Sequence, residues 1–102
     1  MAKQEKMTDS IREWYREAYA DDEWAIAQMA DITFNDVLKV LAYGGCVYDA
    51  IGVGDSVVRE RVFCGLEKRT GLEYDVFYYA WLGTGKKKWA QKQCRAFLEA
   101  AV

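Results

Sequence analysis

Residues 56–82 have the sequence SVVRERVFCGLEKRTGLEYDVFYYAWL, and this stretch decides the fold class of the chain. Asp55 or Ser56 is expected to cap the first helix of this stretch, in which apolar side chains such as Val58 and Val62 recur at the spacing of one helix face. Gly71 then ends the predicted helix, because glycine tolerates the left-handed conformation of a helix C-terminus. Residues 72–82 form a second predicted helix, so the stretch is expected to fold as a helical hairpin.

A glycine also lies inside the first of these helices. Gly65 is on the same face as the apolar side chains, and it has no Cβ atom. It therefore either weakens the helix or allows a neighbouring element to approach closely.

The chain on both sides of the hairpin has the same helical character. Helices are predicted over residues 10–19, 21–29, 33–43 and 86–101, and one or two short helical turns over 46–51. Ser10 and Glu13 are expected to form a capping box at the start of the first of these helices, and Thr33 and Asp36 at the start of the third. No window shows the sustained alternation of a β-strand. We therefore predict an all-α, compact single-domain bundle of five or six short helices over residues 1–102, with a flexible N-terminus over residues 1–8.

The composition argues against catalysis. The chain of 102 residues contains no histidine, which removes the side chain that most often acts as a general base near neutral pH. Its cysteines, Cys46, Cys64 and Cys94, form no CxxC pair, a pattern typical of reduced thiols rather than of a metal site or a disulfide framework. We expect no enzyme activity, no metal and no cofactor.

The cellular location is also suggested by what the sequence lacks. The N-terminal residues MAKQEKMTDS contain no apolar run of the kind found in signal peptides. The longest apolar stretches are too short to span a bilayer. These observations predict a soluble cytoplasmic protein with no membrane partner.

The net charge of −2 hides an uneven distribution. Residues 9–36 carry eight acidic side chains and two arginines, a net charge of −6, whereas residues 84–95 carry five basic side chains and no acid. The five basic residues are Lys86, Lys87, Lys88, Lys92 and Arg95. They predict either contact with a phosphate or an acidic partner, or attraction to the acidic half of the chain itself.

The predicted hairpin is helix-turn-helix-like in outline. Apolar residues and a turn glycine fall at the positions that this motif requires, namely Leu66, Gly71, Leu72 and Phe77. Glu67 departs from the motif, which prefers alanine where the two helices touch. The second helix departs further, because Glu73 and Asp75 stand where a recognition helix needs basic or amide side chains to contact DNA. Binding of nucleic acid, with phosphates held by the basic C-terminal helix, is therefore the alternative hypothesis.

Residues 72–82 contain more aromatic side chains than a short helix can bury. We expect Phe77, Ala80 and Trp81 to face the core. The surplus tyrosines then form a surface of the composition found at protein interfaces, and the residues predicted for it are Tyr74, Tyr78 and Tyr79.

Arginines of the preceding helix are expected to stand away from its apolar face. Either Arg59 or Arg61 could pair with Asp75 and fix the hairpin. Alternatively, the row formed by Arg59, Arg61 and Arg69 belongs to the contact surface, and Arg59 and Arg61 are the members predicted for partner binding.

Residues 54–82 resemble small uncharacterised helical proteins of bacteriophages and other mobile elements. The residues that carry this resemblance are Asp55, Ser56, Val58, Arg59, Glu60, Arg61, Arg69, Tyr74, Asp75 and Trp81. The resemblance implies an accessory gene product, and such products often bind and inhibit host proteins, as anti-CRISPR and anti-restriction factors do.

The sequence therefore favours a non-enzymatic protein-interaction module, a monomer or homodimer, whose partner is a host protein. A self-associating structural subunit, in which the acidic segment of one copy meets the basic helix of the next, is a further alternative.

Overall fold

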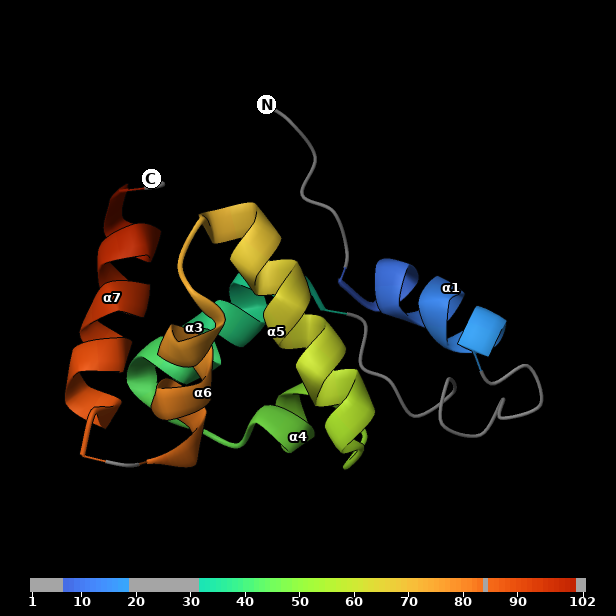
Figure 1. Ribbon diagram of the computed structural model, residues 1–102, viewed down its shortest axis with the longest axis horizontal. Helices are drawn as coiled ribbons and strands as arrows, with labels where there is room; N and C mark the ends of the chain where they lie inside the picture. The colour runs from blue at the N-terminus through green and yellow to red at the C-terminus, as the bar shows by residue number, and fades with distance from the viewer. Residues whose placement is uncertain (1–6, 19–31, 84, 101–102) are drawn as a thin grey trace.

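The computed structural model describes residues 7–18, 32–83 and 85–100, and these residues form six helices and no β-strand (Figure 1). The helices are α1 (Met7–Ala18), α3 (Phe34–Tyr43), α4 (Val47–Ile51), α5 (Ser56–Thr70), α6 (Tyr74–Leu82) and α7 (Lys87–Ala100). The predicted all-α class is confirmed. Each helix in this described part is too short or too polar to cross a membrane.

The N-terminal helix begins earlier than predicted. α1 starts at Met7, so Ser10 lies inside the helix, and the predicted capping box of Ser10 and Glu13 is wrong. No glycine or proline precedes Ser10 within the helix, so nothing in the local sequence stops it from extending toward the N-terminus. Of the expected flexible N-terminus over residues 1–8, only Met7 and Thr8 lie within the described residues, as the first residues of α1. The predicted helix over residues 21–29 lies outside the described residues.

Two of the later helices, α3 and α5, begin with the predicted caps. Thr33 Oγ1 accepts a hydrogen bond from the Asp36 N–H at 3.2 Å, and the Thr33 N–H donates to the Asp36 carboxylate at 3.0 Å. Asp55 Oδ1 accepts from the Val57 N–H at 2.8 Å, which caps α5. Gly71 ends α5 in the left-handed conformation, with φ of +76°. These ends were predictable because the groups that make them are close together in the sequence.

The hairpin of α5 and α6 is closed by Glu67 rather than by an arginine. The Tyr74 N–H at the start of α6 donates to the Glu67 carboxylate at 3.1 Å. Arg59 approaches Glu60 at 3.9 Å and Arg61 stacks on Trp14. Among the described residues neither arginine forms an ion pair with Asp75, so the predicted pairing is wrong. The residue that departs from the helix-turn-helix pattern thus supplies the bond that joins the two helices.

The core lies between α3, α5, α6 and α7. α7 packs against both α3 and α6, while α1 packs against α5 on the other side of the molecule (Figure 1). The fully buried side chains of this core include Val37 and Leu38 of α3, Val62, Phe63 and Leu66 of α5, Phe77 of α6, and Ala90 and Cys94 of α7. α5 is therefore the central element, with one face toward the core and the other toward α1.

Gly65 allows α3 to approach α5 closely. A Cβ atom at this position would lie 2.5 Å from Cε1 of Phe34, the first residue of α3, whose ring is 4% exposed. The close approach is the second of the two roles predicted for Gly65. It places the Phe34 ring beside the face of α5 that α1 covers.

Candidate functional site

The residues predicted for partner binding do not form one surface. Arg59 and Arg61 are two residues apart on α5, so their side chains leave the helix about 200° apart. Arg59 points to α6, where it lies among aromatic rings, and Arg61 points to Trp14 of α1. The predicted site is therefore divided between the two sides of α5.

Arg59 is buried, contrary to the prediction that it stands away from the apolar face. Its side chain is 8% exposed, and its guanidinium carbon lies 4.2 Å from the ring centroid of Trp81 and 5.4 Å from that of Phe63. The reason is that the faces of these rings attract the cation while its aliphatic stem packs on apolar surface. Its Nε and Nη1 atoms have no hydrogen-bond partner. Arg59 is thus an interior residue of the hairpin.

The tyrosines of α6 are half-buried instead of facing solvent. Tyr74 and Tyr78 stack with ring centroids 6.3 Å apart, and Tyr74 also meets Phe63 edge-on at 5.9 Å. Burial raises the pKa of Tyr74 above its usual value, although the nearby charge of Arg59 opposes this shift. Tyr79 is half-buried as well, with the Lys86 ammonium 5.2 Å from its ring centroid. These rings serve mainly to pack the hairpin.

The prediction of which α6 residues face the core is partly correct. Phe77 and Ala80 are buried, whereas Trp81 is only half-buried. The most exposed large apolar side chains of the described residues lie near helix ends, and one of them, Leu82, is the last residue of α6. They are Tyr43, Val57, Leu82 and Trp89, and none of them was predicted to contact a partner.

The basic residues of the C-terminal helix are divided between structural and exposed positions. Arg95 Nη1 donates to the Ala42 carbonyl at 3.0 Å and so satisfies one of the last carbonyls of α3. Lys86 lies over the Tyr79 ring, and Lys87 is half-buried. Lys88 and Lys92 are exposed. The five predicted anion contacts therefore do not act as one uniform basic row.

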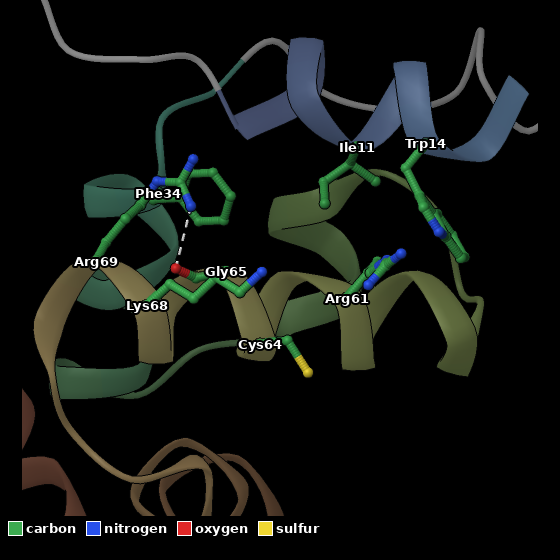
Figure 2. Close-up of a pocket in the computed structure, with 8 residues that line it drawn as sticks. All are labelled: Ile11, Trp14, Phe34, Arg61, Cys64, Gly65, Lys68 and Arg69. Atoms are coloured by element: carbon green, nitrogen blue, oxygen red, sulfur yellow. Dashed lines mark hydrogen bonds between the residues drawn. The ribbon is translucent and has the colours of Figure 1, made fainter. Parts of the chain in front are cut away.

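A cleft of about 210 Å³ lies on the opposite side of α5, between this helix, α1 and the start of α3 (Figure 2). We call it the α1–α5 cleft, and its lining residues are Ile11, Trp14, Phe34, Arg61, Cys64, Gly65, Lys68 and Arg69. The α5 residues recur at three-, four- and seven-residue intervals, which places them on one face of the helix. The other walls come from segments that are distant in the sequence.

Aromatic rings hold the two arginines of the cleft. The guanidinium carbon of Arg61 lies 4.4 Å from the ring centroid of Trp14, and that of Arg69 lies 3.7 Å from the ring centroid of Phe34. Arg69 Nη1 also donates to the Gly65 carbonyl at 3.1 Å. When a guanidinium stacks on an aromatic ring, its N–H groups point outward from the edge of the guanidinium plane, where they can donate to an anion. For the exposed Arg61 this edge is open to a ligand.

The charge of the α1–α5 cleft is strongly one-sided. Arg61, Lys68 and Arg69 are cationic, and none of the described lining residues is acidic. These side chains offer hydrogen-bond donors and no acceptors apart from the thiol of Cys64. The chemistry that fits such a lining is the binding of an anion.

The described residues offer little for catalysis. No group of three or more histidine, cysteine, aspartate or glutamate side chains among them could hold a metal ion. Burial raises the pKa of the Cys94 thiol to about 11, so this cysteine is protonated near neutral pH and is a poor nucleophile. Cys64 lies at the cleft half-buried.

Sequence analysis identified two residues of this cleft, Arg61 and Arg69, but missed their neighbours. Lys68 follows Arg61 by seven residues, and this spacing was a usable signal that both lie on one helix face. Trp14 and Phe34 could not be assigned in the same way, because their contacts depend on how α1 and α3 pack on α5.

No family model, curated protein or solved structure matches this chain. The resemblance to proteins of phages and mobile elements therefore stays a prediction, and function is inferred from the surfaces of the molecule itself.

Proposed function

We propose that this chain is a non-catalytic protein-interaction module that binds an acidic segment of a partner protein in the α1–α5 cleft. One observation carries this proposal: Arg61, Lys68 and Arg69 line the cleft, and no described lining residue is acidic. Complementary charge steers a partner and selects it over others. The volume of about 210 Å³ is below the range of about 300–1,000 Å³ typical of small-molecule sites, so it suits one side chain of a bound segment.

The setting that we propose follows the resemblance of residues 54–82. In this setting the chain is a cytoplasmic accessory protein of a phage or mobile element, and it inhibits or modulates a host protein by stoichiometric binding. Anti-CRISPR and anti-restriction factors act in this way.

Nucleic acid is a less well supported partner. The exposed Lys88 and Lys92 of α7 could contact phosphates. However, α6 occupies the place of a recognition helix, and both Glu73 and Asp75 at its start are exposed acids. They would repel the DNA backbone where the helix has to enter the groove.

A labelled oligo-glutamate peptide tests the proposed function. We expect Arg61→Gln combined with Lys68→Gln to weaken its binding about tenfold, because exposed ion pairs contribute roughly 0.2–1 kcal/mol each. The matched control, Lys88→Gln with Lys92→Gln, removes the same charge from α7 and should bind like the wild type. Fluorescence anisotropy at low and physiological salt measures both variants.

Two results would contradict the proposal. One is equal binding by the wild type and the cleft variant. The other is tighter binding of duplex DNA than of the peptide, together with loss of this DNA binding in the α7 variant. That outcome would favour the nucleic-acid alternative.

A further inference from the structure

Arg61 and Lys68 of the α1–α5 cleft carry more positive charge than one carboxylate can balance. Both side chains are exposed and together carry two positive charges, whereas Arg69 contacts the Phe34 ring and the Gly65 carbonyl. A bound aspartate or glutamate would supply a single negative charge. A phosphate monoester carries about −1.5 to −2 near neutral pH and has three strong acceptor oxygens, so it matches this lining better.

Two of these side chains are placed to share one anion. Arg61 and Lys68 are seven residues apart, which corresponds to about two turns of α5, so they lie on the same face. Figure 2 shows the Lys68 side chain directed along α5 toward Arg61. The Arg61 guanidinium stacks on Trp14 at 4.4 Å, and a flat guanidinium edge matches two phosphate oxygens at once.

The walls and size of the cleft set the scale of the ligand. Its volume of about 210 Å³ lies below the range of about 300–1,000 Å³ typical of small-molecule sites, which suits one phosphorylated side chain better than a whole nucleotide. Ile11, Trp14 and Phe34 provide apolar walls, and a lower local dielectric strengthens each contact between a cation and the anion.

We propose that the α1–α5 cleft binds a phosphorylated serine or threonine side chain of the partner protein. This inference rests on the proposed function and specifies its ligand. A partner protein is favoured over nucleic acid because the cleft is a single small site and the whole chain has a net charge of −2, whereas nucleic acid offers a row of phosphates.

The test compares labelled peptides that are identical except at a central residue, which is serine, aspartate or phosphoserine in a flexible glycine- and alanine-rich sequence. We expect the phosphoserine peptide to bind wild-type protein at least about tenfold more tightly than the aspartate peptide, and the serine peptide to bind more weakly than both. Equal binding of the aspartate and phosphoserine peptides would overturn the phosphate assignment while leaving the proposed function intact. No preference for either over the serine peptide would overturn both.

Variants and competitors identify the site and the source of the phosphate. Arg61→Lys keeps the charge but loses the flat edge, so it should reduce the phosphoserine preference several-fold, and Lys92→Gln on α7 should leave it unchanged. Equal competition by inorganic phosphate and the phosphopeptide would contradict a protein ligand, and so would tighter binding of a single-stranded oligonucleotide.

The Arg61 variants are expected to melt at the wild-type temperature, because Arg61 is exposed. If they melt at a lower temperature, the comparison of the three peptides on wild-type protein still tests the phosphate assignment.

Discussion

Arg59 holds a positive charge inside the hairpin with few hydrogen bonds to support it. Its Nε and Nη1 atoms are buried without partners. The rings of Trp81, Phe63 and Tyr78 lie around its guanidinium, and the exposed Glu60 carboxylate is 3.9 Å from Nη2. A buried cation over an aromatic face gains roughly 2 kcal/mol, but unpaired buried donors cost about 1–3 kcal/mol. The net contribution of the charge is therefore small, and the contribution of Arg59 to stability comes mainly from filling space between α5 and α6.

This balance predicts different outcomes for two substitutions of Arg59. Arg59→Ala leaves a cavity among the rings and should lower the free energy of unfolding by about 2–4 kcal/mol. Arg59→Met keeps most of the volume and removes the buried unpaired donors, so its cost should stay below about 1.5 kcal/mol. Urea unfolding followed by tryptophan fluorescence measures both. A methionine variant as unstable as the alanine variant would show that the charge itself is required.

Among the helices, the contact between α3 and α5 depends on a missing side chain. Gly65→Ala would improve the intrinsic helix propensity of α5 by about 1 kcal/mol. However, the new methyl group would meet the buried Phe34 ring at 2.5 Å, and such overpacking costs about 1–3 kcal/mol. We expect a net loss of stability of up to about 2 kcal/mol in thermal or urea unfolding.

A double variant provides the control for this contact. Phe34→Leu makes room beside Gly65, so the combination with Gly65→Ala should lose less stability than the sum of the two single variants. A Gly65→Ala protein more stable than wild type would mean that α3 can move away from α5 at no cost.

The helices themselves were more predictable than the way in which they pack. Thr33, Asp55 and Gly71 define helix ends through bonds and conformations that involve only neighbouring residues, and all three were identified from the sequence. The start of α1 was not, because its sequence has no breaker before Ser10.

Side-chain environments depend on contacts between distant segments, and there the sequence was less informative. Helical spacing correctly identified Val58 and Val62 as core residues of α5. It wrongly placed Arg59 away from the apolar face, because it could not show that α6 covers Arg59 with aromatic rings. Likewise, the pairing of Trp14 with Arg61 joins α1 to α5 across a long stretch of chain. The candidate site was therefore only partly predictable, through Arg61 and Arg69.

On the scale of the whole molecule, positive charge is found on two separate sides. The α1–α5 cleft lies on one side of α5, whereas α7, which carries the exposed Lys88 and Lys92, packs on α3 and α6 across the core (Figure 1). A ligand that binds one of these surfaces is therefore expected to leave the other undisturbed. This separation makes it possible to distinguish the proposed function from the nucleic-acid alternative by location alone.

The most direct measurement is an NMR titration of ¹⁵N-labelled protein with the oligo-glutamate peptide, observed at the tryptophan indole N–H groups. We expect the indole signal of Trp14 and the amide signals of Arg61 and Lys68 to shift as peptide is added, because these residues line the α1–α5 cleft. The indole signal of Trp89, exposed on α7, should stay in place. Shifts at Trp89 with none at Trp14 would contradict the assignment of the cleft as the binding site.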